Sequence, residues 1–161
     1  ALLEAVHEVP GVERIRFVAT SASRDAENRQ DFVDGVVAAL GVEPEVITGH
    51  EEAELSFRGA TGVLAGRHPG PFLVVDLGGG STELVLGEAS VEAAHSMDVG
   101  CVRMTERHVA GDPPTAEQVA AATADVEAAL DAAARDVPLG RAATVVGLAG
   151  TVTTVTAHAL G

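Results

Sequence analysis

Residues 72–87, FLVVDLGGGSTELVLG, decide the fold class of this chain. An apolar, β-branched strand ends at Asp76, three glycines follow, and a second strand begins near Ser81 and carries Glu83. Glycines let backbone N–H groups close around an anion, and carboxylates are ligands that Mg²⁺ accepts while it keeps most of its waters. The stretch therefore predicts a hairpin that holds a metal-bound phosphate. A hairpin whose glycines only reverse the chain is the simpler alternative.

Two better-known phosphate loops are excluded for this stretch. The dinucleotide fingerprint would need a third glycine in place of Glu83, and a helix where STELVLG reads as a strand. The Walker loop needs a lysine, whereas all ten basic residues of the chain are arginine. The lack of lysine in these 161 residues also excludes Schiff-base chemistry and a pyridoxal lysine.

Composition and charge narrow the class of partner. The chain is 47% hydrophobic and 21% charged, which is ordinary for a folded, soluble protein. The formal charge of −14 repels nucleic acid, and the chain has no Trp and no Tyr to stack on bases, so nucleic acid is not expected as a partner. No apolar run of about 20 residues and no signal peptide is visible, so no membrane partner is expected. The single cysteine, Cys101, favours a reducing, cytoplasmic compartment and is expected to be a small buried hydrophobe.

Strand and helix signals alternate up to the break GRHPGP at residues 66–71, and a run of three strands follows it. Strands are expected at residues 13–19, 45–48, 72–76, 82–87, 91–97 and 143–148. Helices are expected at residues 27–40 and 50–65, near 100, from a Thr115–Gln118 capping box to 135, and in the final TVTTVTAHAL. The pattern predicts two α/β lobes, residues 1–66 and 71–161. The chain opens inside a helical pattern without an initiator methionine, so it is expected to be an excised piece.

Two helices show one-sided apolar patterns that predict their buried faces. In the helix at 27–40 the apolar face comprises Phe32, Val33, Val36, Val37 and Leu40, with Gly41 as the residue that ends the helix. In the helix that begins at Thr115, the residues expected to point inward are Val119, Val126 and Leu130.

A second glycine turn, GLAGT at residues 147–151, joins the last strand to the last helix. The N-terminus of that helix is an anion site by geometry, because its first N–H groups lack partners within the helix. The two turns together predict a domain that grips phosphate from two sides. For Gly150 and Thr151, an ordinary helix cap is the alternative.

Five runs of sequence, in the same order, resemble the exopolyphosphatase and guanosine pentaphosphate phosphohydrolase (Ppx/GppA) family of the actin-like ATPase superfamily. They are ATSASRDAENRQDF (19–32), ITGHEEAELSF (47–57), VVDLGGGSTELVLG (74–87), SMDVGCVRMTE (96–106) and GLAGTVT (147–153). The resemblance implies a ribonuclease H-like, two-lobed fold with mixed sheets flanked by helices. Nothing here matches the family's Asp-Gly-Thr hairpin, so the resemblance implies that the chain begins after that first phosphate loop. It also implies that the chain stops before the second lobe is complete, so that it is an internal fragment with both lobes incomplete.

The resemblance also implies residue roles. Glu52 corresponds to the family's catalytic base, and Asp76 and Glu83 correspond to acids of the metal and catalytic site, with Mg²⁺ or Mn²⁺ as the cofactor. The implied substrate-binding positions are Arg24, Gly78, Gly79, Gly80, Ser81, Thr82, Gly150 and Thr151. Plainer readings stay open from the residues alone: Glu51 and Glu52 as a solvated helix start, and Arg24 as a surface ion pair.

The function that follows is a hydrolase of terminal phosphoanhydrides. Its substrate would be inorganic polyphosphate or the 5′ phosphate of guanosine pentaphosphate, attacked by a water that Glu52 activates. Two alternatives remain: a non-catalytic module that binds polyphosphate or (p)ppGpp, and an ATP-using sugar or acetate kinase on the same fold. A homodimer of the full-length protein stays open, and the 161-residue piece alone is expected to turn over little.

Overall fold

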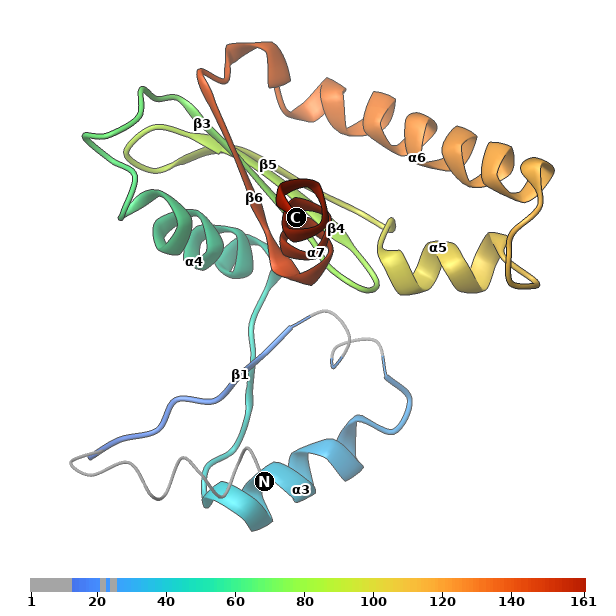
Figure 1. The fold of residues 1–161 in the computed structure, drawn as a ribbon. Helices are drawn as coiled ribbons and strands as arrows, with labels where there is room; N and C mark the ends of the chain where they lie inside the picture. Colours follow the sequence, from blue (N-terminus) through green and yellow to red (C-terminus); the bar gives the residue numbers. More distant parts are fainter. Residues whose placement is uncertain (1–12, 21–22, 24–25) are drawn as a thin grey trace. The chain divides into compact units, whose positions relative to one another are not determined.

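The structure, a computed structural model, describes residues 13–20, 23 and 26–161. The chain divides into two compact units, Ala1–Gly49 and His50–Gly161 (Figure 1). The helical pattern at the start of the chain lies outside the described residues. The lobes at 1–66 and 71–161 stay a prediction about the full-length protein.

The first unit contains two short strands and one helix. β1 (Val18–Ala19) pairs in parallel with β2 (Glu45–Val46), and α3 (Arg29–Leu40) connects them. The strand predicted at 13–19 is shorter than expected, because its partner β2 offers only two residues for pairing. As predicted, α3 ends at Gly41, which adopts a left-handed conformation with φ 69°.

Only part of the apolar face predicted for α3 is buried. Val36 and Leu40 lie in the core, whereas Phe32 and Val37 are exposed by 39% and 43%. The Phe32 ring instead packs at a tilt on Phe17, with 6.2 Å between ring centroids. The prediction of one continuous buried face was therefore wrong for the residues at its margin.

The second unit is built on a mixed four-stranded sheet. Its strands are β3 (Phe72–Leu77), β4 (Thr82–Gly87), β5 (Val91–Met97) and β6 (Thr144–Leu148), in the order β5-β4-β3-β6. The first three form the predicted antiparallel meander, and β6 pairs in parallel with β3. Because β3 and β6 run in the same direction, the two glycine turns that follow them emerge at the same edge of the sheet.

Helix α4 (Gly49–Thr61) covers one face of this sheet. Its Ala53 and Phe57 pack on alternate strand residues, namely Phe72, Val74 and Val85. The helix predicted to continue to residue 65 ends at Thr61, where Leu64 and Ala65 donate their N–H groups back to the Thr61 carbonyl in a turn. Although sequence grouped this helix with residues 1–66, its apolar side packs on the sheet of the second unit.

The remaining helices cover the other face. They are α5 (Cys101–His108), α6 (Ala116–Asp136), the short η1 (Leu139–Arg141) and α7 (Ala149–Leu160). The core on this side consists of Leu73, Leu84, Leu86, Met97, Val99, Ala133 and Val137. On α7, Val152 would lie 2.6 Å from a Cβ at position 147, so Gly147 is what lets α7 pack this closely on β6.

The capping box that begins α6 is confirmed, but the buried face predicted for the helix is confirmed only in part. Thr115 and Gln118 exchange hydrogen bonds of 2.9 and 3.3 Å. Val126 packs on the core as expected, whereas Val119 and Leu130 are exposed. The prediction was wrong for these two residues: the buried residue of α6 is Ala133, and the partly buried Val126 and Ala129 pack against the core beside it.

Asp125 links α5 to α6 through two charged hydrogen bonds. Arg107 Nη1 donates to its carboxylate at 2.6 Å, and His108 Nε2 lies 2.8 Å from the same oxygen. These contacts, that of His108 first and that of Arg107 second, hold the pKa of Asp125 below its ordinary 3.8. A lowered folded-state pKa contributes stability above the unfolded pKa and loses it as the pH falls through the folded value.

We therefore expect Asp125→Asn to lower the melting temperature at pH 7, by no more than about 4 °C because the group is exposed. As the pH falls below 3.8 and through the lowered pKa of Asp125, the difference from the wild type should shrink, since the wild-type carboxylate is then being protonated as well. Thermal melts followed by circular dichroism across pH 2–8 test this. A difference that stays constant with pH would contradict it.

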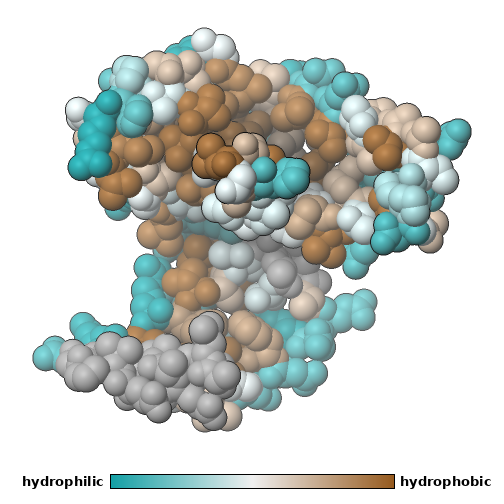
Figure 2. All heavy atoms as spheres, in the orientation of Figure 1, coloured by the Kyte–Doolittle hydropathy of each residue, from teal (hydrophilic) through white to brown (hydrophobic). Residues whose placement is uncertain are grey.

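Apolar side chains also lie at the surface of the second unit. Exposed examples are Val63, Val102, Val145, Val155 and Leu160, and Figure 2 shows brown, hydrophobic atoms on the visible face of this unit. Among the described helices, none is both long and apolar enough to cross a bilayer.

Candidate functional site

The glycine turn after β3 is held in place by the first turn of α5. The backbone N–H groups of Cys101, Val102 and Arg103 donate to the carbonyls of Gly78 and Gly79 at 2.9–3.1 Å. The turn is closed by Gly78 N–H, which donates to Ser81 at 3.0 Å. Within the described residues, the N–H groups of Gly79, Gly80 and Ser81 have no recorded backbone acceptor. The carbonyls therefore face α5, and three donors are left for an anion.

Gly100 allows this close contact between the turn and α5. A Cβ at this position would lie 2.4 Å from the Gly79 carbonyl oxygen and 2.6 Å from the Gly80 nitrogen, both of them backbone atoms. We expect Gly100→Ala to lower the free energy of unfolding by about 1–3 kcal/mol, because the turn must move to admit the methyl group.

Urea unfolding of the full-length protein measures this loss. Gly140→Ala is the matched control, since a Cβ at Gly140 meets nothing within 4 Å. Equal stabilities for the two variants would show that the turn yields without cost.

Asp76 and Glu83 are brought together by the β3–β4 pairing. They are direct partners in the antiparallel register, so their side chains leave the same face of the sheet. Each accepts a hydrogen bond from a serine: Ser96 Oγ donates to Glu83 at 2.9 Å, and Ser56 Oγ donates to Asp76 at a long 3.3 Å. Both acids are partly exposed. The pair thus lies beside the glycine turn with carboxylate oxygens left for a ligand.

Glu52 lies on α4, on the face of the sheet that carries these acids. It is four residues before Ser56, and residues at this spacing lie on one side of a helix. Because Ser56 contacts Asp76, Glu52 is placed about one helical turn from that carboxylate. Glu52 is half-buried and interacts within the protein. Helix α4 therefore holds the predicted base near the predicted acid pair.

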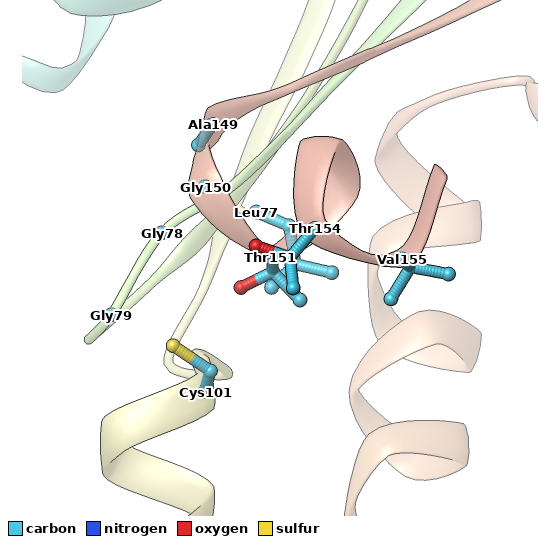
Figure 3. Close-up of a pocket in the computed structure, with 9 residues that line it drawn as sticks. All are labelled: Leu77, Gly78, Gly79, Cys101, Ala149, Gly150, Thr151, Thr154 and Val155. Carbon is cyan, nitrogen blue, oxygen red and sulfur yellow. The ribbon is translucent and has the colours of Figure 1, made fainter. Parts of the chain in front are cut away.

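The second glycine turn meets the first across a pocket of about 540 Å³. Figure 3 shows the start of α7, with Ala149, Gly150 and Thr151, facing the strand end that carries Gly78 and Gly79. Helix α7 has no side-chain cap at its N-terminus. Ala149 adopts φ 69°, a conformation that costs a non-glycine residue energy and is common where a turn is shaped for a ligand.

The pocket and the acid pair lie on opposite sides of the glycine turn. Leu77 lines the pocket, whereas its neighbour Asp76 points to the α4 face, because successive strand residues alternate between faces. None of the three predicted acids lines the pocket. Residues 78–80 lie between the pocket and the acid pair.

Thr82 and Arg24 are the other two residues predicted to bind substrate. The Thr82 hydroxyl donates to the buried carbonyl of Val99 at 2.6 Å, so this side chain anchors the turn to the segment before α5. Arg24 lies outside the described residues.

The donor set fits a metal ion that shares its ligands with a substrate. Among the described residues, no group of three or more His, Cys, Asp or Glu side chains is arranged to hold a metal. Two adjacent carboxylates beside the glycine turn fit the way Mg²⁺ is bound in phosphoryl-transfer sites, through one or two acids, waters and the phosphates themselves. Two of the histidines are engaged elsewhere: His95 with Asp136 and His108 with Asp125.

Sequence reasoning missed several residues of this region. Cys101, expected to be buried, is exposed and projects into the pocket from the first turn of α5, because α5 begins directly at the glycine turn (Figure 3). Ser56 and Ser96 were also missed as partners of the acids. For Ser56 a signal existed: it follows Glu52 by four residues inside a run already singled out for its likeness to one family.

Comparison with curated proteins gives relatives of two kinds. The chain is 58% identical over 152 residues to exopolyphosphatase 2 of Mycobacterium tuberculosis, covering 91% of this chain and 47% of that protein. It is 35% identical over 150 residues to the guanosine-5′-triphosphate,3′-diphosphate pyrophosphatase of Aeromonas salmonicida, covering 92% of this chain and 30% of that protein. The chain thus spans less than half the length of these relatives.

Solved structures agree on the fold. The crystal structure of an exopolyphosphatase-like protein superposes with a TM-score of 0.91 at 53% identity, over 99% of this chain and 51% of the other. A Ppx/GppA enzyme of Aquifex aeolicus gives 0.69 at 34% identity, over 95% and 50%. The expected class, a mixed sheet flanked by helices as in actin-like ATPases, is thereby supported. Two lobes stay a prediction.

The match to a family profile covers nearly the whole chain. Residues 3–159 fit the profile described as the Ppx/GppA phosphatase family. The resemblance drawn from the five sequence runs is confirmed, and this chain belongs to the Ppx/GppA phosphatase family.

Proposed function

We propose that the full-length protein hydrolyses the terminal phosphoanhydride bond of inorganic polyphosphate or of guanosine pentaphosphate at its 5′ end. One observation carries the proposal: a turn with three N–H groups that have no backbone acceptor in the described part of the chain lies between the Asp76–Glu83 pair and the start of α7. The names of the relatives, an exopolyphosphatase and a guanosine pentaphosphate pyrophosphatase, support both substrates.

In this proposal the chain's residues divide the work of phosphoryl transfer. The N–H groups of Gly79, Gly80 and Ser81 donate to oxygens of the terminal phosphate, where negative charge must be stabilised. Glu52 accepts a proton from water as the water oxygen attacks the terminal phosphorus. The bond from that phosphorus to the bridging oxygen breaks, so the products are orthophosphate and a chain shorter by one phosphate.

Asp76 and Glu83 would hold a divalent cation, Mg²⁺ or Mn²⁺. When bound, the ion supplies positive charge to the phosphate oxygens and helps to align the attacking water. Ser56 and Ser96 orient the two carboxylates by donating to one oxygen of each. The pocket toward α7 leaves room for the part of the substrate that is not cleaved.

The test is phosphate release by the full-length protein from long-chain polyphosphate and from guanosine pentaphosphate, with Mg²⁺ or Mn²⁺. We expect release of orthophosphate from at least one substrate, and its loss on adding EDTA. Binding of either substrate without release would favour the non-catalytic module. Phosphate transfer from ATP to a sugar or to acetate would favour the kinase alternative.

A further inference from the structure

Arg103, on α5, lies beside the glycine turn that follows β3. The chain carries a formal charge of −14, so a polyanion needs local positive charge. In the second unit, Arg103 is placed directly at this turn: its Nη2 and Nε lie 3.6 and 4.0 Å from where a Cβ of Gly80 would stand. Its backbone N–H is also bonded to the Gly79 carbonyl at 3.0 Å, which fixes the base of the side chain.

The guanidinium of Arg103 is only partly used by the protein. Nη1 donates to Asp98 Oδ1 at 2.5 Å. Within the described residues, no hydrogen bond is recorded for Nε and Nη2, the two atoms nearest Gly80. The side chain is 38% exposed and its partner Asp98 is 82% exposed. A guanidinium has five N–H donors in a planar fork that suits phosphate, so one edge is free for a ligand.

From these contacts we propose that Arg103 binds a phosphate of the substrate next to the one being cleaved, and that Asp98 opposes this binding. The inference rests on the proposed function, because it takes the glycine turn as the place of the terminal phosphate. Asp98 aligns the guanidinium, but its carboxylate also neutralises it and repels an approaching polyanion. The two residues therefore tune the affinity for a phosphate chain in opposite directions.

The test uses steady-state kinetics of the full-length protein on long-chain polyphosphate at fixed Mg²⁺. We expect Arg103→Ala to raise KM about tenfold while kcat changes less than about twofold, because a charge-assisted contact to an unreacting phosphate is lost. Arg103→Lys should recover part of the loss, since it restores the charge without the fork. Asp98→Asn should lower KM, and the salt dependence of KM should weaken in Arg103→Ala.

Arg107→Ala is the matched control, because Arg107 lies one turn further along α5 and its guanidinium is paired with Asp125. It should leave KM unchanged. If the Arg103–Asp98 ion pair only stabilised α5, both Arg103→Ala and Asp98→Asn would lower the melting temperature, and both would shift KM in the same direction. That result, or an unchanged KM in Arg103→Ala, would overturn the inference.

The inference and the proposed function fail in different ways. If the wild type is active and Arg103→Ala has the same KM, the proposed function stands and only the role of Arg103 is excluded. If the wild type releases no phosphate, the binding of polyphosphate to the wild type and to Arg103→Ala is measured by calorimetric titration. Weaker binding by Arg103→Ala would show that Arg103 contacts the phosphates of a ligand that is bound without being cleaved. No binding, or equal binding by both proteins, overturns it.

Discussion

Asp76→Ala in the full-length protein is expected to reduce metal-dependent phosphate release by at least about 10²–10³-fold. Asp76 ends β3 directly before the glycine turn, and its direct partner across β4 is the only other acid in that register. Its recorded hydrogen bond is a long one, to Ser56 at 3.3 Å. The substitution should therefore remove a ligand while leaving the melting temperature nearly unchanged.

Two further substitutions test the same assignment. Ser56→Ala removes only the hydroxyl that contacts Asp76 and should cost little activity. Glu83→Ala should reduce activity like Asp76→Ala, but less completely if Glu83 reaches the metal through water. Full activity together with an unchanged melting temperature in both acid variants would exclude the pair from the site, and with it the proposed place of the metal.

Glu52→Gln is expected to lower kcat by about 10²-fold or more with little change in KM. Glutamine keeps the shape and hydrogen-bonding reach of glutamate but does not accept the proton of water. The position on α4, one turn before the serine that contacts Asp76, is what makes Glu52 the candidate. Single-turnover and steady-state phosphate release, measured side by side, would show whether the loss lies in the chemical step.

Glu51→Gln is the internal control for this substitution. Both acids lie in the first turn of α4, so both variants lose the same favourable interaction with the helix dipole, typically 0.3–1 kcal/mol of stability. That loss is too small to imitate the removal of a base. Small and equal effects of the two substitutions would return Glu51 and Glu52 to the role of a solvated helix start, and the base would have to be sought among Asp76 and Glu83.

The parts of the fold that sequence predicted well are those determined by local chemistry. The three strands after residue 71 agree with the predicted bounds to within one residue, because β-branched runs are interrupted by glycines that only a turn requires. The start of α6 follows from one capping box. The meeting of the two glycine turns was also predicted, but the parallel pairing that causes it joins residues about 70 positions apart.

The wrong predictions concern the burial of side chains, which depends on the neighbour that covers each one. Val119 and Leu130 have helical spacing, yet the sheet is contacted by the smaller Ala133. Cys101 is typical of a buried residue by type, but α5 starts where the glycine turn accepts its first N–H groups, and this leaves the thiol exposed. Similarly, the Asp98–Arg103 pair is visible only once α5 is placed against Gly80.

The hydrogen bonds from α5 to the carbonyls of Gly78 and Gly79 bear on the thermodynamics of binding. A run of three glycines is the most mobile kind of backbone, and ordering it costs more conformational entropy than ordering any other residues. Here the peptide groups of the turn are already oriented by Cys101, Val102 and Arg103. The entropy is therefore lost when the chain folds and not when an anion arrives, which leaves more of the interaction free energy to appear as affinity.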